Sequence, residues 1–178
     1  MRTLIAAAAL AATLPFAAVS QDRQPYVDPG MAKIVQVAIV CKNIDACSER
    51  WAGVLGVKRN EIHTTVPGHQ AKVIYRGKPS EGRAKLTFFN AGQVVLELME
   101  PVGGDTSWKE FLDKNGEGVQ HIAFQVQDLD KTIESFRERD MPVLHRGRYD
   151  SNDGEYVYVD SKSKLGVTIE LLHSDKKK

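Results

Sequence analysis

The sequence has no excess of charge, few cysteines and, after its first twenty residues, no long hydrophobic run. It carries 24 Lys and Arg against 23 Asp and Glu, and the two counts become equal if Arg2 is removed with an N-terminal leader. This balance, without a basic stripe, argues against nucleic acid as a partner. No later run approaches the roughly 20 apolar residues that span a bilayer. With 42% hydrophobic and 26% charged residues, the 178-residue chain has the composition of a globular protein with one sizeable core.

Residues 1–20 have the pattern of a signal peptide. A short basic start, Met1-Arg2-Thr3, precedes an apolar run that ends at Ala18, and Ala18-Val19-Ser20 offers the small residues that a signal peptidase requires. The alternative is an uncleaved membrane anchor, which this run is too short to form. We therefore expect cleavage after Ser20, a periplasmic or secreted protein with no membrane contact after cleavage, and an N-terminal linker over 21–32.

Cys41 and Cys47 are the only cysteines. In an oxidising compartment they can form a disulfide between the end of the first predicted strand and the start of the next helix. The other interpretation is two free thiols, one of them buried in the strand. Both remain open at this point, because a disulfide requires Cα atoms about 4.4–6.8 Å apart.

The chain repeats itself. Residues 36–45 align without a gap on residues 121–130, and residues 95–99 align on residues 168–172. Such a repeat marks a duplicated module. Gly and Pro turns separate segments of alternating apolar residues, and together they predict a βαβββ order in each module. We expect an α+β fold in which two tandem βαβββ modules form one curved mixed sheet around a metal-binding cleft.

The expected boundaries follow from this repeat. The first module covers 33–101, a connecting helix lies in 102–118, the second module covers 119–173, and 174–178 is a solvated basic tail. In the first module, strands are expected near 33–41, 61–66, 70–75, 85–90 and 94–99. In the second, strands are expected near 120–126, 143–145, 155–159 and 167–172, with a helix over 130–139. Asp45 is expected to cap the first helix, and Trp51, Val54 and Leu55 to face the core.

Each half carries a metal-capable side chain at matching positions. Gln36 and His121 open the two repeats, and Glu97 and Glu170 lie in the closing strands. Because side chains alternate faces along a strand, all four are predicted on one face of the sheet. The opposite face is unbroken hydrocarbon and is expected to pack on the helices: Val37, Ile39, Leu96, Leu98, Ile122, Phe124, Ile169 and Leu171.

Two stretches resemble a known family. Residues 111–124, Phe-Leu-Asp-Lys-Asn-Gly-Glu-Gly-Val-Gln-His-Ile-Ala-Phe, are similar to the approach to the second-module histidine of methylmalonyl-CoA epimerases. Residues 166–171, Gly-Val-Thr-Ile-Glu-Leu, resemble a closing strand with a glutamate ligand. Over residues 33–173 the chain resembles the vicinal oxygen chelate superfamily, which includes glyoxalase I, methylmalonyl-CoA epimerases, extradiol dioxygenases and bleomycin-resistance proteins.

The resemblance implies a divalent metal held by Gln36, Glu97, His121 and Glu170. Epimerases have a histidine where this chain has Gln36 and a glutamine where it has Glu97. Dioxygenases need two histidines and a carboxylate for Fe(II), which this set does not offer. The order Gln, Glu, His, Glu instead resembles the zinc-type glyoxalase I set. Zinc is the expected ion, with nickel, cobalt or manganese as alternatives.

The resemblance also implies the chemistry. A glyoxalase I-like lyase or an epimerase/isomerase would act through a metal-stabilised enediolate, with Glu170 as the base and Glu97 as the second catalytic candidate. Export argues against coenzyme A and glutathione adducts, so a small α-hydroxy-carbonyl compound is the expected substrate. The alternative is a non-catalytic protein that sequesters a small molecule, as bleomycin-resistance proteins do. A homodimer is possible, and the sequence does not show whether a second chain completes the cleft.

Other polar side chains are weaker candidates. His63 and His69 lie in a turn-rich part where a loop could close over a pocket, although solvent exposure is the preferred interpretation. His145 and His173 are expected at the surface. A substrate carboxylate could be held by one of four cations, and two tyrosines could line a pocket: Arg76, Arg146, Arg148, Lys162, Tyr75 and Tyr156.

Overall fold

The computed structural model describes residues 25–176; the expected signal peptide and the first residues of the expected linker lie outside this range. In the first half the elements are η1 (Pro29–Ala32), β1 (Ile34–Val40), α1 (Ile44–Leu55), β2 (His63–Thr64), β3 (Ile74–Tyr75), β4 (Lys78–Pro79), β5 (Arg83–Asn90) and β6 (Val95–Val102). They continue with α2 (Ser107–Asn115), β7 (Gly118–Gln125), α3 (Leu129–Arg137), β8 (Val143–Arg148), β9 (Gly154–Val159), α4 (Lys162–Leu165) and β10 (Thr168–Ser174).

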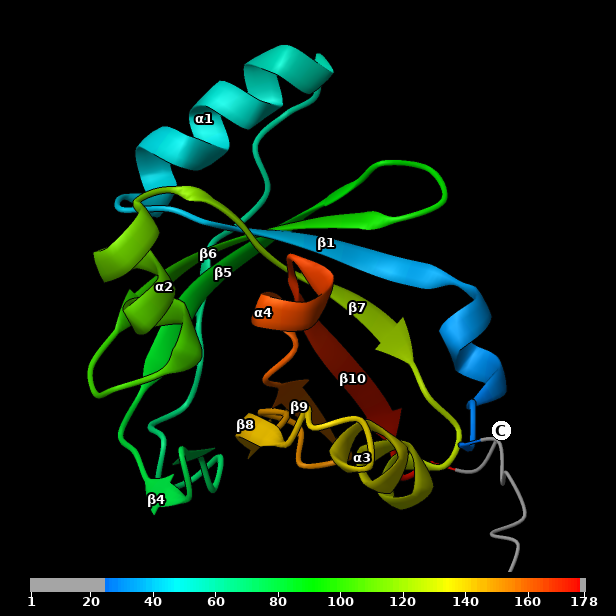
Figure 1. Cartoon of the computed structure of the whole chain (residues 1–178). Helices are drawn as coiled ribbons and strands as arrows, with labels where there is room; N and C mark the ends of the chain where they lie inside the picture. The colour runs from blue at the N-terminus through cyan, green and yellow to red at the C-terminus, as the bar shows by residue number, and fades with distance from the viewer. Residues whose placement is uncertain (1–24, 177–178) are drawn as a thin grey trace, which may run out of the picture.

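All strands belong to one curved, ten-stranded mixed sheet, which confirms the expected α+β fold (Figure 1). Its order is β2-β5-β6-β1-β7-β10-β9-β8-β3-β4. The two strands that open the halves, β1 and β7, pair antiparallel at the centre. Each then pairs in parallel with the closing strand of its own half, β6 or β10. The sheet therefore places the first and last strands of both halves side by side.

The sequence repeat is also a repeat of strand register. Gln36 on β1 lies opposite Val95 on β6, and its counterpart His121 on β7 lies opposite Thr168 on β10. The donor positions of the two halves consequently stand in equivalent places on the sheet. Apolar residues of the other sheet face pack with α1 in one cluster and with α3 in another.

A hairpin departs from the expected modular order. The strand expected over 70–75 shrinks to β3, because residues 68–72 form turns and Lys72 adopts a left-handed backbone with φ of 51°. This β3–β4 hairpin belongs to the first half in sequence but extends the sheet of the second half, where Ile74 lies opposite Arg146 of β8. The chain thus crosses from one side of the cleft to the other between β2 and β5.

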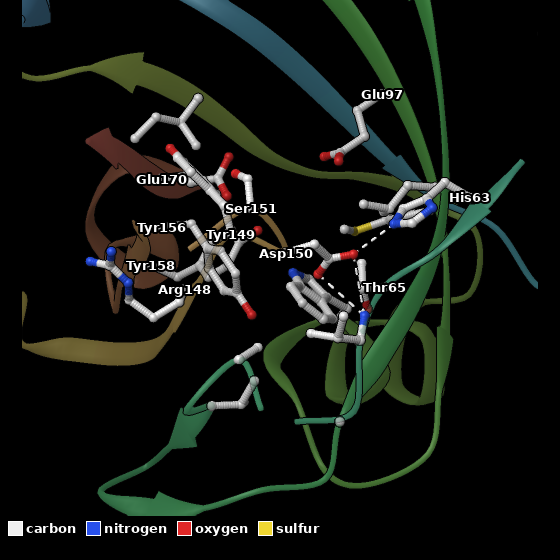
Figure 2. A pocket seen from close by; sticks show the side chains of 18 of the residues that line it. His63, Thr65, Glu97, Arg148, Tyr149, Asp150, Ser151, Tyr156, Tyr158 and Glu170 are labelled. Atoms are coloured by element: carbon white, nitrogen blue, oxygen red, sulfur yellow. Dashed lines mark hydrogen bonds and ion pairs between the residues drawn. The ribbon is translucent and has the colours of Figure 1, made fainter. Parts of the chain in front are cut away.

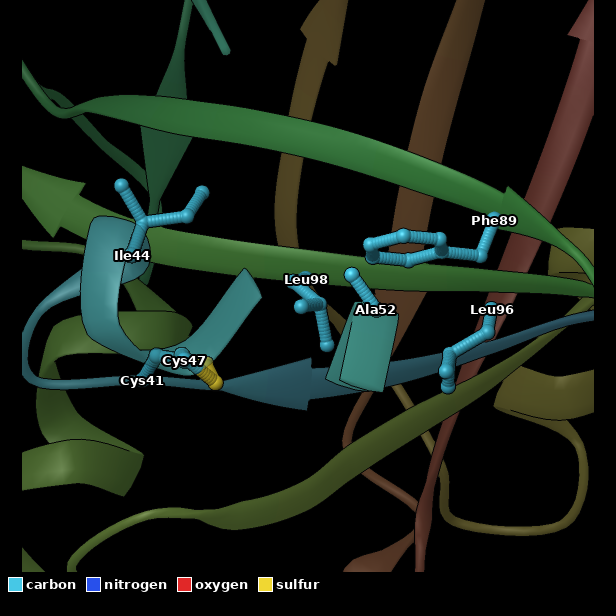
Figure 3. Packing of buried hydrophobic residues seen from close by; sticks show 7 residues of the cluster. All are labelled: Cys41, Ile44, Cys47, Ala52, Phe89, Leu96 and Leu98. Atoms are coloured by element: carbon cyan, nitrogen blue, oxygen red, sulfur yellow. A yellow bond between two sulfur atoms is a disulfide. The ribbon is translucent and has the colours of Figure 1, made fainter. Parts of the chain in front are cut away.

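Helix α1 packs differently from its predicted orientation. Asn43, not Asp45, is the N-cap, since its side chain accepts from the Ala46 N–H. Val54 is 79% exposed and Leu55 is 36% exposed, so neither faces the core as expected. Trp51 is partly buried and packs against the core cluster, as expected. The buried positions of the helix are Ile44, Cys47, Ser48 and Ala52. Three of them, Ile44, Cys47 and Ala52, form a cluster with Leu96, Leu98 and Phe89 (Figure 3).

Cys41 and Cys47 form a disulfide with Cα atoms 6.2 Å apart (Figure 3). This answers the question that the sequence left open. Both sulfur-bearing side chains are buried in the α1 cluster. The bond therefore fixes the first turn of α1 to the end of β1, the strand that carries Gln36.

Part of the expected linker is firmly attached. The buried carboxylate of Asp28 accepts from the backbone N–H groups of Gly30, Gln127 and Asp128 at 2.8–3.1 Å. This anchors the N-terminal segment to the turn between β7 and α3. No helix within residues 25–176 is long and apolar enough to cross a membrane.

Candidate active site

The four side chains predicted to bind a metal meet at the centre of the sheet. Gln36 Nε2 donates to Glu97 Oε2 at 2.7 Å and lies 3.4 Å from both His121 Nε2 and Glu170 Oε2. His121 Nε2 lies 3.4 Å from Glu97 Oε2 and 3.1 Å from Glu170 Oε2. All four come from one chain, so no partner is needed to supply a donor.

These distances can be compared with those around a metal. A tetrahedral zinc ion with bonds of about 2.1 Å separates its ligand atoms by roughly 3.4 Å, close to the 3.4 and 3.1 Å from His121 Nε2 to Glu97 and Glu170. Within residues 25–176, no three or more His, Cys, Asp and Glu side chains are placed so that they could hold a metal ion as they stand, so the carboxylates would have to move to bind one. The amide of Gln36 would present Oε1 in place of Nε2, a half-turn about its last bond. One imidazole nitrogen and three oxygens then form a donor set that suits a divalent cation.

The ring of His121 is oriented by its neighbour Gln120. His121 Nδ1 lies 2.6 Å from Gln120 Oε1, and both side chains are buried. Because an amide oxygen accepts, Nδ1 donates to it, and Nε2 is turned toward Gln36, Glu97 and Glu170. The contact depends on an irregularity of β7: Ala38 pairs with His121 and Ile39 with Val119, which leaves Gln120 outside the ladder. Such a bulge re-aims a side chain that strict alternation would send to the opposite face.

Buried charges determine the protonation of the cluster. Burial alone lowers the pKa of His121, but the carboxylates of Glu170 and Glu97 outweigh it and raise this pKa to about 9. Burial raises the pKa of Glu97; the charge of Glu170 adds to this effect and His121 opposes it. The two carboxylates thus favour the protonated ring, and a bound cation would have to displace the proton at Nε2.

A cavity of about 490 Å³ opens beside Gln36, Glu97 and Glu170. Figure 2 shows Glu97 and Glu170 on facing sides of it. Its volume is within the range of small-molecule sites. The wall is mainly apolar and aromatic: Val66, Ala71, Val73, Leu86, Phe88, Met99, Trp108, Tyr149, Tyr156, Tyr158 and Leu172. The burial of Tyr158 and the charges of Glu170 and Glu97 raise the pKa of its phenol well above the usual value, so Tyr158 stays neutral.

The weaker candidates separate into cavity and surface residues. His63 lines the cavity, and its Nε2 lies 2.6 Å from Asp150 Oδ2, a contact between the two halves (Figure 2). His69 instead pairs with Glu81 outside the cavity. Of the four cations only Arg148 lines the cavity, whereas Arg76, Arg146 and Lys162 contact Glu110, Glu155 and Asn115. Tyr156 also lines the cavity, while Tyr75 contacts Glu110.

His145 was expected at the surface, and that prediction is wrong. The side chain is fully buried, stacks on Tyr158 with ring centroids 5.3 Å apart, and has Nδ1 3.0 Å from Ser107 Oγ. Burial and the charge of His121 lower its pKa to about 3. His145 therefore supports the aromatic wall as a neutral ring. His173, also expected at the surface, is partly buried.

Sequence reasoning missed Asp150, Trp108, Phe88 and Gln120. Asp150 and Trp108 lie in segments outside the repeated strands, where no pattern pointed to a cavity. Phe88 had a usable signal, since alternation along β5 places it on the same face as Leu86. Gln120 had none, because a bulge cannot be read from residue spacing.

Comparison with known proteins identifies the family of the chain. Residues 35–159 match the sequence profile of the Glyoxalase/Bleomycin resistance protein/Dioxygenase superfamily. The human mitochondrial methylmalonyl-CoA epimerase is 23% identical over 169 residues, which cover 91% of this chain and 88% of that protein. An uncharacterized Bacillus subtilis protein, YqjC, is 32% identical over 92 residues, or 51% of this chain and 66% of that protein.

Solved structures give the same result. A variant of the Streptomyces coelicolor methylmalonyl-CoA epimerase in complex with 2-nitronate-propionyl-CoA has a TM-score of 0.58 and 28% identity, and covers 81% of this chain and 98% of that one. A methylmalonyl-CoA epimerase in complex with methylmalonyl-CoA and NH4+ has a TM-score of 0.55 and 30% identity, with 80% and 94% covered. The chain therefore belongs to the glyoxalase/bleomycin resistance/dioxygenase superfamily, also known as the vicinal oxygen chelate superfamily.

Proposed function

We propose that this protein is a metal-dependent enzyme that moves a proton on a carbon next to a carbonyl group, as an epimerase, isomerase or glyoxalase I-like lyase. One observation carries the proposal: four donors from matching repeat positions converge at the edge of a 490 Å³ cavity. Gln36, Glu97, His121 and Glu170 would hold the cation. Zinc suits this set, with nickel, cobalt or manganese as alternatives, and would supply the charge that polarises two vicinal oxygens of a small α-hydroxy-carbonyl substrate.

Glu170 is assigned as the base that removes the substrate proton. Its carboxylate lines the cavity and lies on β10 opposite the neutral Tyr158 of β9. Glu170 takes the proton from one face of the carbon. Glu97 would return a proton to the other face, which gives an epimer, whereas return by Glu170 to the neighbouring carbon gives an isomer. Glu97 is the second carboxylate of the cavity and the alternative base.

The relatives support proton chemistry more strongly than they support a particular substrate. Methylmalonyl-CoA epimerases are among the similar solved structures, and epimerisation of a carbon next to a carbonyl requires a proton to leave and return. Export to the periplasm or beyond, with cleavage after Ser20, would separate this chain from coenzyme A thioesters. The Cys41–Cys47 disulfide supports an oxidising compartment.

The test is exchange of the substrate α-proton for deuterium in heavy water, followed by NMR on zinc-loaded protein. Glu170→Gln keeps the shape and one oxygen donor but removes the base, so we expect exchange to fall by roughly 100-fold or more while zinc largely remains. Glu134→Gln makes the same change on the exposed face of α3 and serves as the control. Exchange by Glu170→Gln at the wild-type rate would exclude Glu170 and make Glu97 the next residue to test.

The alternative is a non-catalytic protein that sequesters a small molecule, as bleomycin-resistance proteins do. The mainly apolar and aromatic cavity wall favours it, since such a wall can retain a ligand without any reaction. Stoichiometric metal in the purified protein together with proton exchange supports the enzyme. Tight binding of small aromatic compounds with neither metal nor exchange supports the binding protein.

A further inference from the structure

An aromatic side chain stands beside each of the two carboxylates. On β5 and β6, Phe88 lies directly opposite Glu97. On β9 and β10, Tyr158 lies directly opposite Glu170. Cross-strand partners point to the same face of a sheet, and all four side chains line the cavity. The two halves thus repeat an aromatic neighbour as well as a donor.

The two rings differ in how much of their surface is free. Tyr158 is 2% exposed and is held by Trp108 and His145, whose ring centroids lie 5.8 and 5.3 Å away. Phe88 is 42% exposed although it lies on the cavity face. The core therefore does not use the Phe88 ring, and covering it would bury apolar area that is now in water. An incoming apolar or aromatic group is the partner that this ring lacks.

The charges of the cavity wall disfavour an anionic ligand. Glu97, Asp150 and Glu170 contribute three carboxylates. Among the lining residues that the structure describes, Arg148 is the single Lys or Arg. Its guanidinium is already engaged, with Nη2 2.7 Å from Asn152 O and in a salt bridge with Asp175. Even with a divalent cation at the four donors, no free cation of the wall remains for a carboxylate or phosphate group.

Resting on the proposed function, we propose that the substrate is an uncharged α-hydroxy-carbonyl compound with an aromatic substituent. Its two oxygens would face Gln36, Glu97, His121 and Glu170. Its ring would cover Phe88, with the fixed Tyr158 on the other side of the cavity as the second aromatic wall. Phe88 is then the residue that determines specificity.

Binding tests this without catalysis. Benzohydroxamic and acetohydroxamic acid share a metal-chelating pair of vicinal oxygens and differ in a phenyl against a methyl group. Calorimetry on zinc-loaded wild-type protein should show roughly 10-fold tighter binding of the benzo compound, as expected for burying a ring on an aromatic wall. Phe88→Ala should reduce this preference at least fivefold. Phe88→Leu keeps apolar volume without the ring and should give an intermediate preference.

Val54→Ala is the control for an apolar truncation, since Val54 is 79% exposed on α1 and does not line the cavity; it should keep the wild-type preference. Equal preference in wild type and Phe88→Ala overturns the aromatic site. Failure of both hydroxamates to bind overturns the metal centre and the aromatic site with it.

Proton exchange separates this inference from the proposed function. Phenylacetylcarbinol should exchange with a higher kcat/KM than acetoin, which has the same reacting group without a ring, and the anionic mandelate should be the poorest substrate. Exchange of both neutral compounds with no dependence on Phe88 leaves the enzyme standing and refutes the aromatic site. If the hydroxamate preference depends on Phe88 but no compound exchanges its proton, the aromatic site stands and the proposed enzyme activity is refuted. Preference for mandelate refutes the assignment of an uncharged substrate.

Discussion

Replacement of Gln120 by leucine tests how the metal centre is organised. The Gln120 amide oxygen lies 2.6 Å from His121 Nδ1, and the two side chains are 2% and 0% exposed. Leucine has a similar volume but no acceptor. Two consequences compete in the variant: a buried Nδ1–H stays unpaired, or the ring proton moves to Nε2, where Glu97 and Glu170 accept it and the metal-binding lone pair is lost.

Both consequences weaken metal binding. An unpaired buried donor costs about 1–3 kcal/mol, and loss of the group that orients a ligating histidine lowers metal affinity by roughly 10–100-fold. We therefore expect the zinc dissociation constant of Gln120→Leu to rise within that range. The measurement is a competition titration of zinc between the protein and a chromophoric chelator at fixed pH.

Two variants control this experiment. Gln120→Glu keeps an oxygen acceptor for Nδ1–H and should retain tighter binding than the leucine variant. Gln127→Leu repeats the substitution at an exposed position after β7 and should bind zinc like wild type. If Gln120→Leu folds normally and its zinc affinity stays within twofold of wild type, the bulge on β7 does not orient His121, and the reasoning fails.

Further predictions concern metal, stability and processing. His121→Ala should lose bound metal by elemental analysis; equal metal content in both proteins would exclude His121 as a ligand. Asp28→Ala leaves the N–H groups of Gln127 and Asp128 without their acceptor and should cost about 2–4 kcal/mol of unfolding free energy at pH 7. Burial raises the pKa of Asp28, but the hydrogen bonds from Asp128, Gly30 and Gln127 lower it overall. The stability that Asp28 contributes is thus present above the unfolded pKa near 3.8 and is lost as pH falls through the lower folded pKa. Denaturation curves of wild type and Asp28→Ala should therefore converge in acid. Mass spectrometry of protein from the native host should find Gln21 at the N-terminus; an intact Met1 form in the cytosol would contradict export.

The convergence of Gln36, Glu97, His121 and Glu170 could be predicted because two simple rules combine. Strand alternation fixes the face of each side chain, and the repeat assigns equivalent places to the two halves. Neither rule requires knowledge of which strands are neighbours. The role of Phe88 requires that knowledge, since its pairing with Glu97 is a property of the register between β5 and β6.

Other features depend on local departures from regular structure. Gln120 faces His121 only because a bulge interrupts the period of two. Val54 and Leu55 are exposed, while Ile44, Cys47 and Ala52 fill the α1 cluster. Composition alone did not determine which side of that helix meets the sheet. The burial of His145 likewise follows from its aromatic neighbours, which are Trp108 on α2 and Tyr156 and Tyr158 on β9.

The β3–β4 hairpin has a consequence for folding. Residues 74–79 come from the first half but cover the outer edge of β8 in the second. A second half expressed alone would leave β8 as a bare edge, open to pairing with other chains. Neither half can therefore complete its native contacts without the other, and these long-range contacts couple them into one cooperative unfolding unit. Cutting the chain between the two halves would separate β3 and β4 from the part of the sheet that they extend.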